Sequence, residues 1–239
     1  MLANEGFVIV SINYELASGE KYPAPIIQLG EAYTFIENSG ETYPFIDKDS
    51  VYFGGDSAGA HIASQFITIQ TNSDYLSLLN TFDQTMDVKK VVQKDIKGAI
   101  LFAGPYDFEA LSNLVKGRST KNESSILSSA ISFLAKRIGQ AYLSDRNWKQ
   151  NEDYAVLSIT NYVSAIFPRT FITDGRTFSF EDHVRTLEEN LISKGVDVTS
   201  VYYDFDLAHE YQFNLGTNFE DGNNYAQMTF NKLLEFLNK

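Results

Sequence analysis

A serine flanked by glycines lies where a predicted strand meets a predicted helix. Three β-forming residues occupy positions 51–53, and residues 55–59 read G-D-S-A-G. This matches G-x-S-x-G, a pattern typical of a sharp turn that exposes a nucleophilic serine. An alanine-rich helical pattern follows at once, so Ser57 lies at the top of a strand–turn–helix unit. The arrangement predicts nucleophilic chemistry at Ser57, although the glycines could instead serve only to close the turn.

The spacing within this turn has a steric explanation. We expect Ser57 to adopt a strained backbone conformation that holds its hydroxyl clear of the sheet. Gly55 and Gly59 are expected to lack side chains because a Cβ at either position would strike the neighbouring strand or helix. The N–H of Ala58 begins the helix and is predicted to donate to a developing oxyanion. Asp56 is expected to order the turn.

A serine nucleophile needs a general base, and the sequence holds three histidines. His209 follows a late predicted strand and lies in a loop, where the reactive groups of open α/β sheets gather. His209 is therefore the predicted base, with a solvated loop histidine as the alternative. His61 lies on the helix after Ser57 and is expected to point into the fold. His183 lies within a later predicted helix and is interpreted as a surface residue.

The acid that would orient the base is less sharply defined. Asp174 ends the predicted strand before the one that leads to His209, which gives the chain order serine, aspartate, histidine. An aspartate directly before a glycine is also common in turns that have no catalytic role. Asp107 ends the preceding predicted strand and is the second candidate. Glu181 and Asp182 are weaker candidates.

Apolar runs of strand length alternate with helical patterns along the chain. Strands are predicted at 7–14, 51–53, 96–103, 169–173 and 198–205, and helices at 24–38, 58–69, 184–192 and 225–237. Near-continuous apolar runs are typical of strands buried on both faces. The alternation predicts an α/β fold with a mainly parallel sheet and helices on both faces.

The length of 239 residues favours one domain over residues 1–239. Residues 72–94 are polar and are expected to form a loop with a short helix. Residues 108–164 lie between the strands that end near Ala103 and Thr173, and they are too many for a simple crossover. They are interpreted as a helical insertion or a partial lid, with helices at 126–134 and 135–143.

Composition excludes several classes of partner and site. The net charge of −12 argues against nucleic acid and anionic membranes as partners. The absence of cysteine excludes disulfides and thiolate metal sites, and it suits a cytoplasmic protein. No basic N-terminal region precedes a long apolar core, and the apolar run at 7–12 is too short to span a membrane.

Several segments together resemble the α/β-hydrolase superfamily, in particular the esterase and lipase branch related to hormone-sensitive lipase. They are residues 6–16, 22–25, 46–47, 54–60, 167–175 and 209–213, of which the G-D-S-A-G block is the most specific. The resemblance implies an α/β-hydrolase fold and a serine hydrolase that cleaves small-molecule carboxylic esters through an acyl-enzyme on Ser57. It implies no cofactor and no metal.

The sequence departs from this family in two places. The family's H-G-G-[GA] oxyanion loop should precede residues 7–14, and nothing in the chain matches it. The family's usual acid falls at Phe178, so Asp174 would have to replace it. We therefore expect an N-terminally truncated member that lacks the early strands, in which residues 1–5 end a helix.

Two alternatives to an active ester hydrolase remain, and the open sheet edge has a further consequence. The chain could be a catalytically impaired hydrolase scaffold, because losing one oxyanion donor typically costs roughly 100- to 1000-fold in rate. The same fold could instead carry a peptidase or a lactonase. An open sheet edge would also favour marginal stability and association into a homo-oligomer.

Overall fold

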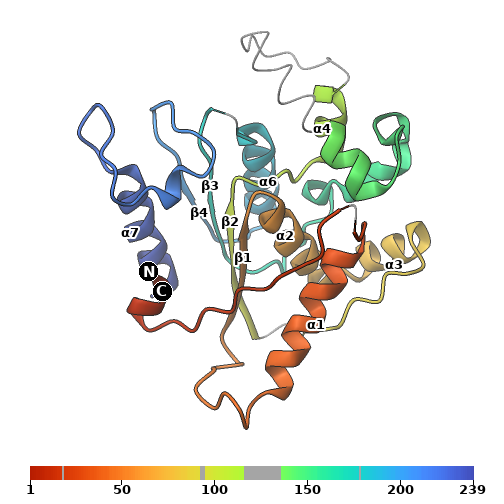
Figure 1. Ribbon diagram of the computed structural model, residues 1–239, viewed down its shortest axis with the longest axis horizontal. Coiled ribbons are helices and arrows are strands. Elements are labelled where there is room, and N and C mark those ends of the chain that lie inside the picture. Colours follow the sequence, from red (N-terminus) through yellow and green to blue (C-terminus); the bar gives the residue numbers. More distant parts are fainter. Residues whose placement is uncertain (18, 92–94, 116–135, 178) are drawn as a thin grey trace.

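The computed structural model describes residues 1–17, 19–91, 95–115, 136–177 and 179–239. Its sheet consists of four parallel strands that follow one another in chain order (Figure 1). They are β1 (Val51–Asp56), β2 (Ile96–Phe102), β3 (Thr170–Thr173) and β4 (Val198–Val201). Asp56 pairs with Phe102, which pairs with Thr173, so the carboxyl ends of the strands meet at one edge. The predicted parallel sheet is confirmed, although β4 is shorter than predicted.

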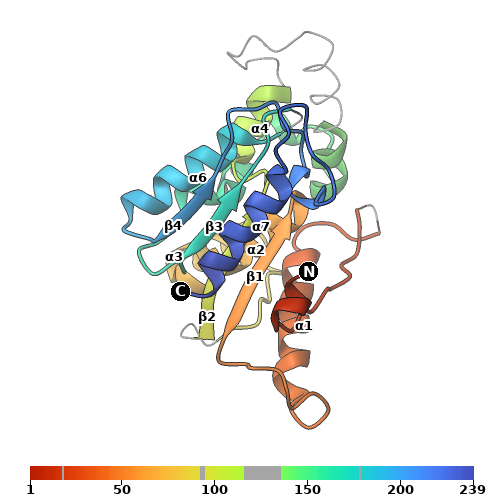
Figure 2. The same ribbon diagram turned by 90° about the vertical axis from the view of Figure 1, so that its left-hand side faces the viewer.

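The helices divide between the two faces of this sheet, as predicted (Figures 1 and 2). One face carries α1 (Ala24–Asn38), α2 (Ala58–Thr71) and α6 (Glu181–Ser193), and the other carries α7 (Tyr225–Leu237). The helix α3 (Ser73–Phe82) packs beside α2 and supplies the short helix expected within residues 72–94.

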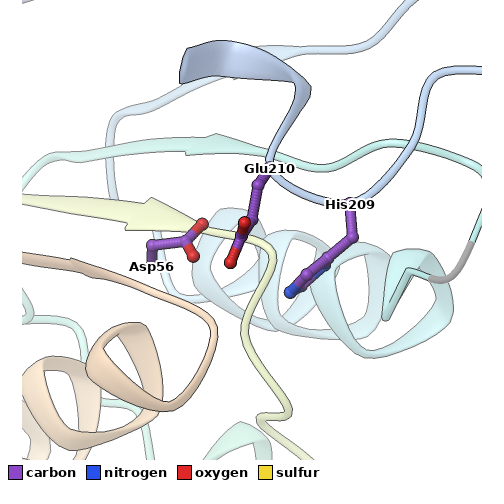
Figure 3. Close-up of side chains that lie close together, drawn as sticks. All are labelled: Asp56, His209 and Glu210. Carbon is purple, nitrogen blue, oxygen red and sulfur yellow. The ribbon is translucent and has the colours of Figure 1, made fainter. Parts of the chain in front are cut away.

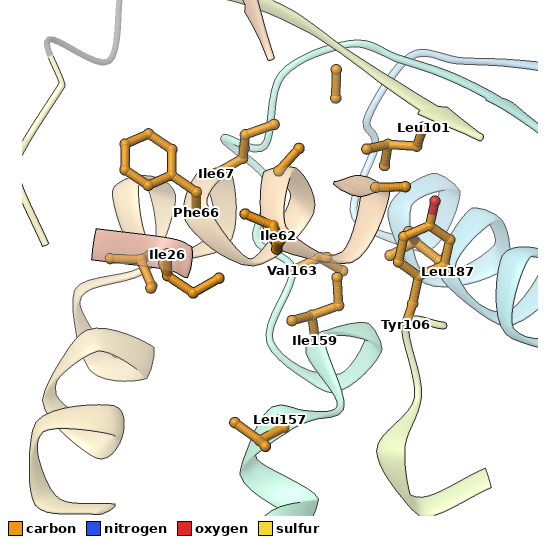
Figure 4. Packing of buried hydrophobic residues seen from close by; sticks show 14 of the residues in the cluster. Ile26, Ile62, Phe66, Ile67, Leu101, Tyr106, Leu157, Ile159, Val163 and Leu187 are labelled. Atoms are coloured by element: carbon orange, nitrogen blue, oxygen red, sulfur yellow. The ribbon is translucent and has the colours of Figure 1, made fainter. Parts of the chain in front are cut away.

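Alternation along the strands supplies side chains to a core on each face. Phe53, Leu101 and Ile172 belong to the larger core, where Figure 4 shows Leu101 among side chains from α1, α2 and α6. Their neighbours point the other way, and Phe171 and Val201 pack against α7 in a smaller core. The sheet is thus covered on both faces, and its carboxyl edge is left for the loops.

The segment at residues 7–14 is not a strand, which corrects the prediction for this run. Leu2–Glu5 forms a short 3₁₀ helix, and the chain then crosses extended from the α7 side toward α1 (Figure 1). Val8, Ile9 and Val10 are 46%, 55% and 50% exposed, and no backbone hydrogen bond joins residues 8–14 to another described segment. A strand needs a hydrogen-bonded neighbour, and an apolar pattern alone does not supply one.

The described part of residues 108–164 packs into the larger core. It begins with α4 (Phe108–Val115), and residues 136–143 are helical, close to the predicted helix at 135–143. Three 3₁₀ helices follow, Trp148–Gln150, Glu152–Leu157 and Ile159–Asn161. Trp148 and Leu157 are buried against the larger core. The predicted helix at 126–134 lies outside the described residues, and the lid remains a prediction.

Among the described residues, no helix is both long and apolar enough to cross a membrane.

Candidate active site

Ser57 lies between β1 and α2 in a conformation that L-residues rarely adopt. Its φ is 53° and its ψ is −116°. Backbone strain of this kind is retained only where the surrounding structure holds it in place. The Ser57 N–H donates to the Phe102 carbonyl at 2.9 Å, which fixes the turn to the end of β2. The strained turn expected from the sequence is therefore present.

The two glycines that flank Ser57 have different surroundings. A Cβ at Gly55 would lie 2.3 Å from the Gly59 carbonyl carbon, so no side chain fits there. A Cβ at Gly59 would meet no atom within 4 Å. The steric expectation is right for Gly55 and wrong for Gly59, because the Cβ direction of the second residue of α2 leads into open space.

Ala58 is the first residue of α2, and it is exposed. The first N–H groups of a helix have no partner within the helix and carry the positive end of its dipole. No hydrogen-bond acceptor for the Ala58 N–H is found in the part of the chain that the structure describes. This N–H can therefore donate a hydrogen bond to an anionic oxygen beside Ser57.

His209 lies in the loop after β4, directly before Glu210 and the 3₁₀ helix Tyr211–Phe213. Its N–H donates to the Thr177 carbonyl at 2.9 Å. Its Nδ1 lies 3.9 Å from Asp174 Oδ1, which is ion-pair range but longer than a hydrogen bond. The carboxylate of Asp174 is buried and accepts from the N–H groups of Gly175 and Phe180 at 2.7 and 2.8 Å.

The pair is electrostatically coupled. The Asp174 carboxylate raises the pKa of His209 above its ordinary value, and Asp56 and Glu210 add to this effect. Burial raises the pKa of Asp174, while the nearby His209 opposes that rise. The negative charges around His209 thus favour its protonated form, as a base that must take up a proton requires.

The rival acids are held elsewhere. Asp107 Oδ1 accepts from Ala110 N–H at 2.9 Å and from Ser158 Oγ at 3.0 Å. Glu181 pairs with Arg185 at 3.2 Å, and Asp182 lies in the first turn of α6. Among the described residues, Asp174 is the carboxylate within 4.0 Å of a His209 nitrogen. Position 178, where the resemblance places the acid, lies outside the described residues.

The other two histidines are buried in the fold. His61 packs against Phe108 with ring centroids 5.2 Å apart, and burial lowers its pKa to about 4. His183 is also buried, and its Nδ1 accepts from Asp107 N–H at 3.2 Å. The surface interpretation of His183 is wrong, because this residue shares the inward face of α6 with Leu187. Its spacing of four residues from Leu187 was the available signal.

Glu210 and Gln212, which lie near His209, had no predicted role. Asp56, His209 and Glu210 each place one nitrogen or oxygen atom within 4.8 Å of the others (Figure 3). Gln212 Nε2 donates to Asp56 Oδ1 at 2.8 Å. Burial raises the pKa of Asp56 to about 6, and the charge of His209 opposes that rise. Proximity to His209 in the sequence was the signal for Glu210 and Gln212.

One imidazole and two carboxylates form a donor set that suits Zn²⁺, so Asp56, His209 and Glu210 are the described residues able to hold a metal ion. The donor atoms of the two carboxylates, Asp56 and Glu210, lie within 4.8 Å of that of the third donor, His209, which is also the candidate base. The expectation from the sequence, that no metal takes part, remains a prediction.

The family model BD-FAE matches residues 1–184. The chain belongs to the BD-FAE family. This match covers the Ser57 turn, β1, β2, β3 and Asp174, and it ends within α6. No curated protein sequence matches this BD-FAE member.

Solved structures share the fold of this BD-FAE member. A structure from a study of two fungal esterases from Rhizomucor miehei aligns with a TM-score of 0.60 and 16% identity, over 95% of this chain and 62% of that one. The Pyrobaculum calidifontis esterase aligns at 0.61 and 17%, over 97% and 68%. An esterase of the bacterial hormone-sensitive lipase family aligns at 0.60 and 18%, over 94% and 63%.

These similarities confirm the predicted α/β-hydrolase fold, which the chain shares with these esterases. The chain spans 62% of the length of the first of these esterases and 68% of the second.

Proposed function

We propose that this chain is a serine hydrolase that cleaves carboxylic esters through an acyl-enzyme on Ser57. The observation that carries the proposal is the strained Ser57 at the β1–α2 turn, with φ 53°. It stands at the sheet edge to which the Asp174–His209 pair also belongs. The names of the structural neighbours, which are esterases, support an ester substrate.

In the proposed reaction, His209 takes the proton from Ser57 Oγ as the oxygen attacks the ester carbonyl carbon. The tetrahedral intermediate places its negative oxygen against the Ala58 N–H. His209 then gives its proton to the leaving alcohol as the ester C–O bond breaks. Water attacks the acyl-enzyme in the same way and releases the carboxylic acid. Asp174 stabilises the protonated imidazole in both steps.

Two observations favour a second candidate, a catalytically impaired scaffold. The His209–Asp174 separation of 3.9 Å exceeds a hydrogen bond, and no hydrogen bond of Ser57 Oγ is found among the described residues. Catalytic hydrogen bonds are often longer without substrate, so ester hydrolysis remains the first proposal.

A fluorophosphonate probe tests the proposal directly. The purified chain is expected to become labelled on the peptide that contains Ser57, as read by mass spectrometry, and to hydrolyse p-nitrophenyl acetate faster than buffer. A lactone and a peptide substrate, assayed in parallel, test the lactonase and peptidase alternatives. A folded chain that takes no label and turns over no ester contradicts the proposal and supports the impaired scaffold.

The pH dependence of hydrolysis is expected to report the Asp174–His209 pair. His209 must be neutral to accept the Ser57 proton, and Asp174 raises its pKa above the ordinary value of about 6.5. Activity should therefore rise with pH through a midpoint above 6.5. Asp174→Asn removes the largest cause of the raised pKa, so the midpoint should move to lower pH as the maximal rate falls.

The matched control for this experiment is Asp107→Asn, which removes a carboxylate that the structure does not pair with His209. Its midpoint should stay at the wild-type value. A midpoint that shifts with Asp107→Asn and not with Asp174→Asn would reverse the assignment.

A further inference from the structure

A partly buried side-chain hydrogen bond joins the Ser57 turn to the His209 loop. Gln212 Nε2 donates to Asp56 Oδ1 at 2.8 Å, across 156 positions of the sequence. Asp56 is the residue directly before Ser57, and Gln212 lies three residues after His209. The bond therefore connects the elements that carry the proposed nucleophile and the proposed base.

The partners of this bond are fixed in orientation. Gln212 is only 6% exposed, and its Oε1 has no partner among the described residues. Turning the amide over would place Oε1 against the Asp56 carboxylate, and two acceptors repel each other. The amide thus serves as a donor to Asp56, and its other atom is left unbonded at a cost in desolvation.

The neighbouring residue holds the same 3₁₀ helix to the rest of the sheet. The hydroxyl of Tyr211 lies 2.7 Å from Thr173 Oγ1 at the end of β3 and 3.0 Å from Thr229 Oγ1 of α7. Tyr211 therefore fixes the Tyr211–Phe213 helix to β3 and α7, whereas Gln212 fixes it to β1. Phe213 also meets Phe102 edge-on at 6.0 Å, but its side chain is 57% exposed and restrains the loop less.

We propose that Gln212 and Asp56 are positioning residues that hold His209 in reach of Ser57. The inference rests on the proposed function and adds a role for two residues outside the predicted triad. Neither residue needs to touch the substrate. The catalytic rate depends steeply on the positions of the reacting groups, and a displacement of about 1 Å can lower it roughly 100-fold.

The test compares Gln212→Ala with a matched control, Asn190→Ala. Asn190 Nδ2 donates to the Thr160 carbonyl at 2.8 Å in a hydrogen bond that is also partly buried, so both variants lose one bond of the same length. Gln212→Ala is expected to lower kcat for p-nitrophenyl acetate by about 10- to 100-fold with little change in KM. Asn190→Ala should keep the wild-type kcat.

Exchanging the donor and the acceptor between positions 212 and 56 distinguishes an effect on the position of His209 from a general loss of stability. Gln212→Glu sets two carboxylates against each other and should lower kcat at least as much as Gln212→Ala. Adding Asp56→Asn to Gln212→Glu gives an amide donor at 56 and an acceptor at 212, which restores the bond. The double variant is expected to recover at least tenfold in kcat over Gln212→Glu, with Tm measured for every variant.

The outcomes divide clearly. A wild-type chain that is folded but neither labelled at Ser57 nor active overturns the proposed function, and this inference with it. An active wild type whose kcat is unchanged in Gln212→Ala overturns this inference alone. If Gln212→Ala does not fold, the comparison of Gln212→Glu with the double variant decides, and absence of recovery overturns the inference.

Discussion

Replacing Ser57 by alanine is expected to lower kcat for p-nitrophenyl acetate by about 10⁶-fold, to the level of background hydrolysis. The proposed reaction forms its only covalent bond to the protein through Ser57 Oγ, and alanine has no atom that can replace it. The fold should survive, because no hydrogen bond of this hydroxyl is found among the described residues and the turn is held by backbone contacts such as Ser57 N–H to Phe102.

The measurement is a steady-state assay, with circular dichroism to confirm that Ser57→Ala is folded. Ser77→Ala is the matched control, since the Ser77 hydroxyl donates to the Ser73 carbonyl at 2.9 Å within α3, a helix separate from the Ser57 turn. Ser77→Ala should keep full activity. Activity that persists in Ser57→Ala, above buffer and above a mock purification, would rule out Ser57 as the nucleophile.

Replacing His209 by alanine is expected to lower kcat by a factor on the order of 10⁴ or more. The imidazole is the proposed acceptor of the Ser57 proton, so its removal takes away the general base of the reaction. The side chain of His209 is partly exposed, so its removal should leave Tm nearly unchanged.

His61→Ala and His183→Ala serve as controls for this prediction, because both residues are buried. Each should lower Tm, since removing a buried ring leaves a cavity, and each should retain most of its kcat below the new Tm. If His61→Ala abolished activity while His209→Ala remained active, the assignment of the base to the loop histidine would be wrong.

Local chemistry explains why the Ser57 turn could be predicted from sequence. Gly55, Ser57 and Gly59 lie within five consecutive positions. The close approach of position 55 to Gly59 follows from the strand–turn–helix geometry alone. The parallel sheet was equally accessible, because buried strands such as Ile96–Phe102 are apolar over nearly their whole length.

Non-local contacts explain what could not be predicted. Residues 7–14 have the composition of a buried strand, but strand formation depends on a partner that the composition does not encode. The contact of His183 with the start of α4 is also non-local, because its Nδ1 accepts from the Asp107 N–H, 76 positions away in the sequence. The bond between Gln212 and Asp56 joins residues 156 positions apart, so no local pattern predicts it.

The distance between His209 and Asp174 could also not be predicted from the sequence. Chain order correctly brings the two residues to the same sheet edge, yet the distance of 3.9 Å depends on how the loop after β4 is seated. The role of Asp174 therefore remains a prediction that the pH experiment tests.

The unequal surroundings of the two glycines bear on how this turn tolerates mutation. Any substitution of Gly55 is sterically incompatible with the turn, because a Cβ there would lie 2.3 Å from the Gly59 carbonyl carbon. At Gly59 the fold imposes no such barrier, because a Cβ there would meet no atom within 4 Å. Selection for folding alone would thus preserve the first glycine and leave the second free to drift. A glycine that persists at position 59 under mutational pressure would have to be kept by whatever molecule occupies the space beside it.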